Sequence, residues 1–275
     1  MNADDLGLAA SVNRGIVETM ERGVVRSASL IVNLGAHEDA IGRIADTRSR
    51  GVDLGIGLHF DVVAGAPLTA CPSLTDARGR FLPLATLALR AVAGRIDARD
   101  VERELEAQLD RAESLLAAIG LRVTHVDSHR HAHCLPGVFD VVLRVADRRG
   151  IAHVRHPHES TRTLKASPLR LLASGALRLA LTRSPPTDDV EFTGIGLMAS
   201  RRVERDLLQL LDVLPAGTTE LMMHPGYDSP ELAAIDAYRV PRELELRALT
   251  SPSVRDRVRD LGMELTHFGA IAPPA

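Results

Sequence analysis

Histidine is concentrated in one short stretch of this chain. Four of its eleven histidines, His125, His129, His131 and His133, fall within nine positions. If residues 125–129 lie on a strand, His125, Asp127 and His129 project from the same face. Imidazoles beside a carboxylate can hold a divalent ion and leave it the open positions that hydrolysis through a bound water requires. The pattern also fits a solvated turn whose histidines bond one another, or a site in which His131 binds the ion together with His129.

Two adjacent acids lie near the start of the chain. On a regular strand Asp4 and Asp5 would face opposite ways, but at a strand end followed by Gly7 the backbone can turn and present both. One carboxylate could then bind a metal ion while the other accepts a proton. The alternative is a turn with helix-capping acids. If both acids follow the first strand, that strand is truncated, unless the chain starts upstream of Met1.

Three more polar residues lie at or near the ends of apolar runs. His59 lies in the run Gly55–Phe60, where a lone histidine is more often a satisfied core residue than a ligand. His224 precedes a Pro-Gly turn and could act in acid-base chemistry or merely bond that turn. Arg155 could bind a substrate, orient a carboxylate or form a salt bridge at the rim.

The elements that would position these residues alternate along the whole chain. Short β-branched or apolar runs are separated by amphipathic stretches, which is typical of an α/β fold. Seven or so strand-helix units predict a parallel sheet closed, or nearly closed, into a (β/α) barrel, with functional groups at the carboxyl ends of the strands. We expect a single domain over residues 1–275, with an excursion of loops and one short helix over 64–97. The expected strands are Val24–Asn33, Leu54–Phe60, Val123–Asp127, Ile151–Arg155, Val190–Ile195, Thr219–His224 and Glu264–Phe268.

The clearest helix is expected over Asp100–Ile119. Asp100 can cap its first turn, and Gly120 supplies the stop. An apolar stripe at helical spacing supports it, formed by Leu105, Leu109, Ala112 and Leu116.

Composition and charge argue against several classes of protein. A formal charge of −3 and a pI near 6.4 provide no basic surface for phosphates, so we expect no nucleic acid partner. The two cysteines, Cys71 and Cys134, form no CxxC arrangement, which favours a reducing compartment and a cytoplasmic location. The N-terminus is acidic and lacks the apolar run of a signal peptide. The apolar stretch Leu169–Leu181 is interrupted by arginines and too short to span a bilayer, so membrane insertion is not expected.

Taken in order, these segments resemble one family, the YdjC-like carbohydrate deacetylases, which include chitooligosaccharide deacetylases. The most specific stretch is HVDSHRHAH, from His125 to His133. Leu6 stands where the family usually has phenylalanine, and no functional side chain is missing. Similar stretches are NADDLGL from Asn2, VNRGI from Val12, GLHF from Gly57, LMMHPGY from Leu221 and RELEL from Arg242.

The resemblance implies a (β/α) barrel of the deacetylase type with one divalent metal ion bound by Asp5, His59 and His129. It matches Asp4 to the general base, and His224 is the candidate general acid. The implied reaction is removal of an acetyl group from an N-acetylated sugar through a metal-activated water. Relatives also suggest a homodimer.

Residues around the implied metal ion have expected supporting roles. Asp127 would orient a ligand imidazole, while Arg155 and His131 would lie behind the ligands or against the substrate. Magnesium or zinc is expected, with manganese or cobalt also accepted by such ligands. The low aromatic content of 3%, without tryptophan, favours a small or unusual sugar over extended chitin. Two other functions stay open: a sugar-binding barrel without catalysis, and a metal hydrolase acting on another amide, such as a lipid-linked or formylated amino sugar.

Overall fold

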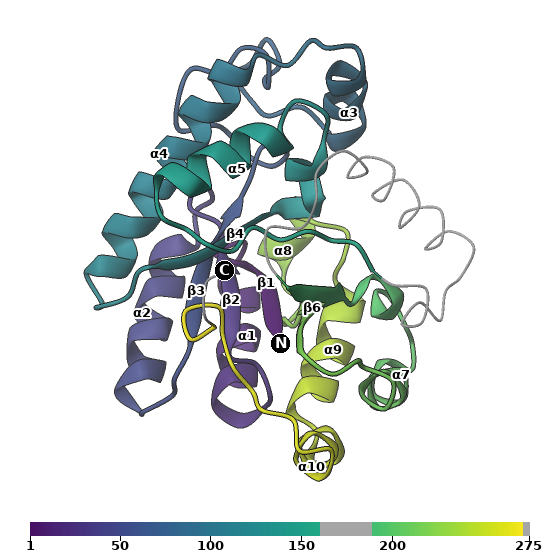
Figure 1. Ribbon diagram of the computed structural model, residues 1–275. Coiled ribbons are helices and arrows are strands. Elements are labelled where there is room, and N and C mark those ends of the chain that lie inside the picture. The colour runs from purple at the N-terminus through teal and green to yellow at the C-terminus, as the bar shows by residue number, and fades with distance from the viewer. Residues whose placement is uncertain (160–188, 272–275) are drawn as a thin grey trace.

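Six parallel strands form one curled sheet in this computed structural model, which describes residues 1–159 and 189–271. The strand order is β4-β3-β2-β1-β6-β5. Figure 1 shows the helices on the outside of the sheet. The strands are β1 Asn2–Leu6, β2 Ser27–Leu30, β3 Gly55–Phe60, β4 Val123–Ser128, β5 Val190–Thr193 and β6 Thr218–Met223.

An irregular segment, residues 151–159, joins the two edges of this sheet. Val154 forms a parallel bridge with Val126 of β4, and Glu159 forms one with Phe192 of β5. The predicted strand Ile151–Arg155 therefore exists only as an isolated bridge. Pro157 has no N–H to donate, so a regular ladder cannot continue through it. The α/β barrel expected from the sequence is confirmed, with closure through bridges instead of a full strand.

The helices up to α7 lie between successive strands, α8 to α10 follow the last strand, and η1 and η2 are short 3₁₀ segments. No helix in the described ranges combines the length and apolarity needed to cross a membrane. The stretch Leu169–Leu181 lies outside these ranges. The elements are α1 Ala10–Arg22, α2 His37–Ser49, α3 Leu84–Val92, α4 Ala98–Ala117, η1 His129–Cys134, α5 Phe139–Arg148, η2 Ile195–Leu197, α7 Val203–Leu211, α8 Pro230–Ile235, α9 Val240–Thr250 and α10 Pro252–Asp260.

The helix expected over Asp100–Ile119 is α4, and the four apolar residues of its stripe are fully buried. Its cap differs from the prediction. Asp97 accepts a hydrogen bond from the Arg99 backbone N, whereas Asp100 lies inside the first turn and accepts one from the Ser73 backbone N at 2.8 Å. Asp100 therefore holds the long excursion between β3 and α4 against the helix.

Two expectations about the ends of the chain need correction. β1 begins at Asn2, and Asp4 and Asp5 lie within it, not after it. Glu264–Phe268 forms no strand. Instead, the Phe268 ring packs 4.2 Å from the His125 ring and 5.4 Å from the His153 ring, measured between centroids. The segment predicted to be a seventh strand thus packs its aromatic side chain against residues near the start of β4.

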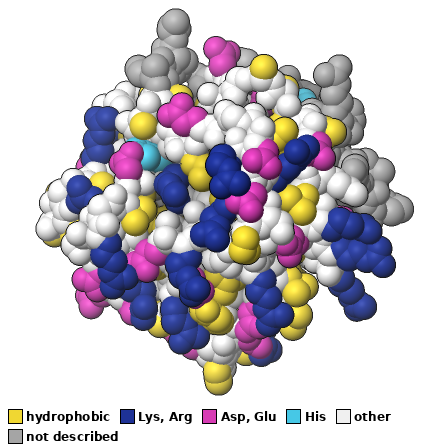
Figure 2. Space-filling model, turned by 90° about the horizontal axis from the view of Figure 1, so that it is seen from below, with side chains coloured by type: hydrophobic (Ala, Val, Ile, Leu, Met, Phe, Trp, Pro, Cys, Tyr) yellow, Lys and Arg dark blue, Asp and Glu magenta, His cyan; other side chains and the backbone are white. Residues whose placement is uncertain are grey.

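The outer surface carries charges of both signs. On the face seen from below in Figure 2, arginine and acidic side chains are interspersed. One such cluster joins α4 and α5, where Arg149 pairs with Glu106, Asp110 and Glu113. Exposed pairs of this kind contribute at most about 1 kcal/mol each, whereas removing one partner of a buried pair costs about 3–5 kcal/mol.

Candidate active site

Asp4 and Asp5 both contribute to one site because β1 is irregular at Asp5. Asp5 has a φ of 71°, in the left-handed region that residues other than glycine seldom adopt. The register between β1 and β2 also shifts between Ala3 and Leu6. Backbone strain of this kind costs about 1–3 kcal/mol and is concentrated at functional sites. The turn that the sequence suggested near Gly7 therefore already begins at Asp5.

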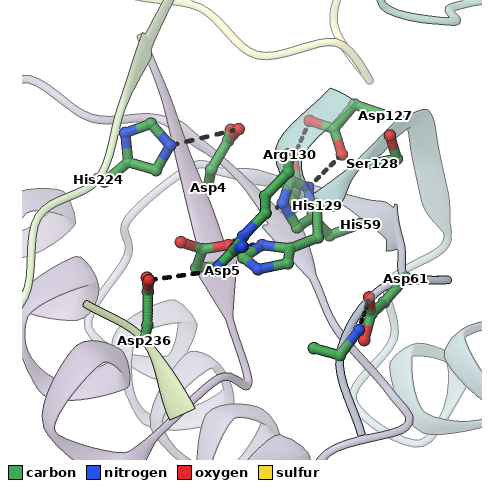
Figure 3. A network of polar contacts seen from close by, with 12 residues as sticks. Asp4, Asp5, His59, Asp61, Asp127, Ser128, His129, Arg130, His224 and Asp236 are labelled. Atoms are coloured by element: carbon green, nitrogen blue, oxygen red, sulfur yellow. Dashed lines mark hydrogen bonds and ion pairs between the residues drawn. The ribbon is translucent and has the colours of Figure 1, made fainter. Parts of the chain in front are cut away.

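Asp5, His59 and His129 converge from three neighbouring parts of the sheet. Asp5 lies on β1, His59 near the end of β3, and His129 directly after β4. The Asp5 Oδ1 atom is 2.7 Å from His129 Nδ1 and 3.3 Å from His59 Nε2. All three side chains are buried, and one ligand atom from each lies within 4.8 Å of the others (Figure 3). This group could hold a metal ion.

Asp127 lies behind His59. Its Oδ1 atom is 2.6 Å from His59 Nδ1, so the Nε2 atom of the ring is directed at Asp5. Ser29 donates a hydrogen bond to Asp127 Oδ2 at 2.6 Å and fixes the carboxylate in turn. Burial lowers the pKa of His59, but the carboxylates of Asp127, Asp4 and Asp5 together outweigh it, and the pKa rises to about 10. The negative charge around this ring is therefore suited to a cation.

Arg155 lies at the centre of the barrel, not at its rim. Its guanidinium contacts both oxygens of Asp4 at 2.7 Å, Asp127 Oδ2 at 2.7 Å and Glu220 Oε1 at 2.5 Å. Burial alone would raise the pKa of Asp4, but Arg155 more than offsets this and lowers it. Asp4 is therefore ionised at neutral pH. The interpretation of Arg155 as a rim salt bridge was wrong, because carboxylates of three separate strands surround it.

His224 directly follows β6 and faces Asp4. Its Nε2 atom is 4.0 Å from Asp4 Oδ2. Figure 3 shows the His224 ring facing this carboxylate. The side chain is 12% exposed, so the ring is accessible from solvent while it contacts the buried acid. The structure thus brings together the five residues proposed for catalysis and metal binding.

Most of the chain, residues 1–260, matches the YdjC-like protein family. This chain belongs to that family. A carbohydrate deacetylase of Geobacillus stearothermophilus is 37% identical over 98% of this chain and 95% of its own length. A chitooligosaccharide deacetylase of Yersinia pestis (strain Pestoides F) is 32% identical over 98% and 96%.

A solved structure supports the fold. An Enterococcus faecalis V583 protein named for cellobiose-phosphate cleavage superposes with a TM-score of 0.77 at 25% identity, covering 98% of this chain and 97% of that one. The α/β barrel of this YdjC-like protein therefore has a counterpart along nearly its whole length.

The other histidines of the cluster have different positions. His125 lies two residues before Asp127 on β4 and bonds Ser29 Oγ at 3.1 Å. Burial lowers the pKa of His125 to about 4. His133 bonds Ser128 Oγ and, at 2.9 Å, the backbone oxygen of Arg155. His131 packs against the Phe192 ring, 5.9 Å between centroids. Within the described ranges, none of these three joins a group that could hold a metal ion, so the geometry does not favour His131 as a ligand.

A second group of possible ligands consists of Asp4, His59 and Asp127. Arg155 already bonds both of these carboxylates, so a cation there would have to displace a buried guanidinium. In the group containing Asp5, the buried guanidinium of Arg242 bonds Oδ2, while Oδ1 faces both histidines. It is the better of the two places for a metal ion.

Sequence reasoning gave no role to three charged residues of the site. Arg242 Nη2 donates to Asp5 Oδ2 at 2.6 Å and to Asp236 Oδ2 at 2.7 Å. Arg130 pairs with Asp236 at 3.4 Å and extends across the front of Asp5 in Figure 3. Glu220 contacts Arg155 from β6. The RELEL segment was the only sequence signal for Arg242, and no spacing rule could connect it with Asp5, 237 positions earlier.

Proposed function

We propose that this protein is a metal-dependent carbohydrate deacetylase that hydrolyses the acetamide of an N-acetylated sugar. One observation carries the proposal: a single oxygen of Asp5 faces nitrogen atoms of both His59 and His129, while the neighbouring Asp4 faces His224. The deacetylase relatives support the reaction class.

Asp5, His59 and His129 would hold the divalent ion. Two imidazoles and a carboxylate suit zinc and accept magnesium, manganese or cobalt, and they leave coordination positions open. When bound, such an ion supplies a Lewis acid that lowers the pKa of water and polarises the acetyl carbonyl. Asp127 keeps His59 Nε2 directed at the site, and Arg242 engages Asp5 Oδ2, so Oδ1 remains for the ion.

Asp4 and His224 would handle the protons. Asp4 is ionised at neutral pH and held by Arg155 and by Asn2, which donates to its Oδ1 atom at 2.8 Å. It would accept the proton of the water that attacks the acetyl carbon. His224 would donate a proton to the nitrogen as the C–N bond breaks, releasing acetate and the free amino sugar.

The test combines metal content with acetate release. N-acetylated mono- and disaccharides are incubated with the wild type and with the Asp5→Ala, His59→Ala and His129→Ala variants, each with added zinc, magnesium, manganese or cobalt. We expect the three variants to lose both bound metal and turnover. Asp53→Ala is the matched control, because its carboxylate is 90% exposed and far from these residues in the fold.

Mass spectrometry of the products separates the alternatives. Loss of a formyl group would move the substrate class, and sugar binding without product would indicate a barrel that has lost catalysis. A triple variant of Asp5, His59 and His129 that retained full turnover would refute the proposed function.

A further inference from the structure

Glu245 of α9 is buried directly behind His224. Its side chain is about 3% exposed. The Oε2 atom accepts a hydrogen bond from the His224 backbone N at 2.5 Å and lies 3.9 Å from Nδ1 of the same ring. A carboxylate therefore faces the side of His224 that is turned away from Asp4.

Tyr238 holds that carboxylate in one orientation. Its hydroxyl donates to Glu245 Oε1 at 2.5 Å and accepts a hydrogen bond from the Ala199 backbone N at 2.8 Å. Because the hydroxyl oxygen already accepts from Ala199, its single proton is directed to Glu245. The Tyr238 ring also packs edge-on against His224, 5.4 Å between centroids. The position of Glu245 relative to His224 is thus fixed from two sides.

The Nδ1 atom of His224 is the unsatisfied group in this arrangement. It is buried and has no hydrogen-bond partner among the described residues. Burying a polar nitrogen without a partner is unfavourable, so an acceptor within reach is favoured. Glu245 Oε2, at 3.9 Å, is such an acceptor, and a modest rotation of the ring would bring the two atoms into hydrogen-bond distance.

We propose that Glu245 is a positioning residue for the general acid: it accepts a hydrogen bond from Nδ1 of His224 and so directs the Nε2 proton toward the departing amine. This inference rests on the function proposed above. It deepens that function by assigning roles to Glu245 and, behind it, Tyr238. A positively charged imidazole with a carboxylate at one nitrogen donates its other proton in a fixed direction.

A purely structural role is the competing explanation, since Glu245 also caps the backbone of the His224 turn. Glu245→Gln separates the two. The amide oxygen of glutamine can still accept from the His224 backbone N, but the negative charge is lost. Glu243→Gln is the matched control on the same helix, because Glu243 is partly exposed and its printed contacts, a hydrogen bond from the Asp228 backbone N at 3.2 Å and an ion pair with Arg247 at 3.7 Å, do not involve His224.

Steady-state deacetylation by the metal-loaded enzyme gives the first readout. We expect Glu245→Gln to lower kcat by about 10-fold to 100-fold, a part of what general acid catalysis supplies, with KM within about twofold. Tyr238→Phe should lower kcat in the same direction but less. Bound metal and the unfolding midpoint should stay at wild-type levels in each variant.

Nitrogen-15 histidine NMR gives a readout that needs no turnover, with His224→Gln assigning the resonance. Among the described residues, Asp4 from β1, Tyr238 before α9 and Glu245 from α9 face this ring, and His131 from η1 interacts with it electrostatically. Only Glu245 changes in Glu245→Gln. In the wild type we expect a larger share of the neutral ring to carry its proton on Nδ1 than in the variant.

These measurements keep the two proposals apart. A wild type without acetate release would overturn the proposed function, whatever the NMR shows. An identical His224 tautomer in the wild type and Glu245→Gln would overturn the role of Glu245, whether or not the enzyme is active. A Glu245→Gln variant with wild-type kcat would do the same.

Discussion

Glu220 allows a quantitative test of the charge balance around Arg155. Its side chain lies on β6 at the barrel centre, only 4% exposed, with Oε1 2.5 Å from Arg155 Nη2. Burial raises the pKa of Glu220 from 4.5 to about 7, and it outweighs the opposing effect of Arg155. The neighbouring charges of Asp127 and Asp4 act in the same direction as burial.

The sign of the pH dependence follows from these two values. Between pH 4.5 and about pH 7, the folded protein holds a proton on Glu220 that the unfolded chain has already released. This contribution to stability is complete below pH 4.5 and is lost as the pH rises through about 7. The separation of about 2.5 pH units corresponds to about 3 kcal/mol. Glutamine cannot ionise, so Glu220→Gln does not lose this contribution. Its free energy of unfolding relative to the wild type should therefore rise by up to about 3 kcal/mol from acidic to alkaline pH.

Urea unfolding at a series of pH values from about 4 to about 8 measures this difference in the free energy of unfolding. The two proteins should be nearly equal at the acidic end and diverge toward the alkaline end. Glu191→Gln on the neighbouring strand β5 is the control, because Glu191 is exposed, and it should follow the wild type throughout. A difference between Glu220→Gln and the wild type that stays constant with pH would refute the reasoning.

Four other substitutions test separate parts of the structure. Gly57→Ala should cost about 1–3 kcal/mol in urea unfolding, because an added Cβ would overlap the His125 ring, and wild-type stability would contradict this packing. Asp127→Asn should weaken metal binding by about 10-fold to 100-fold in a chelator competition, since His59 loses the carboxylate that orients it; unchanged affinity would show that the ring is held otherwise. Arg155→Met should cost about 3–5 kcal/mol, and a stable variant would mean that its three carboxylates find another partner. Asp97→Ala should cost about 1 kcal/mol as the cap of α4, and no loss would return the role to Asp100.

The parts of the site that follow from local periodicity could be predicted from the sequence. Alternation along β4 correctly placed Asp127 on the inner face, and the apolar run before His59 correctly indicated a strand. The sequence suggested that Asp4 and Asp5 face the same site, but it did not show at which residue the backbone turns. The turn depends on one positive φ at Asp5, an angle that aspartate rarely adopts. A single backbone angle of this kind leaves no clear signal in composition.

Long-range charge pairing could not be predicted in the same way. Arg155 ended an apolar run, which fits a rim position as well as a central one, and its partner Asp4 lies 151 positions away in the sequence. The segment Glu264–Phe268 has the pattern of a strand, yet its aromatic residue packs on two histidine rings instead. In both cases tertiary contacts between distant segments decide the outcome, and local propensity does not record them.

The position of Arg155 also bears on how the chain folds. Its three carboxylate partners lie on β1, β4 and β6, while the guanidinium lies on the segment that joins the sheet edges. A fragment ending before residue 151 would bring Asp4 and Asp127 together with no cation between them. The strands before residue 151 and those after it therefore both need Arg155 to balance their buried carboxylates. We expect ring closure and charge neutralisation to be one late event, so that the molecule folds and unfolds as a single cooperative unit.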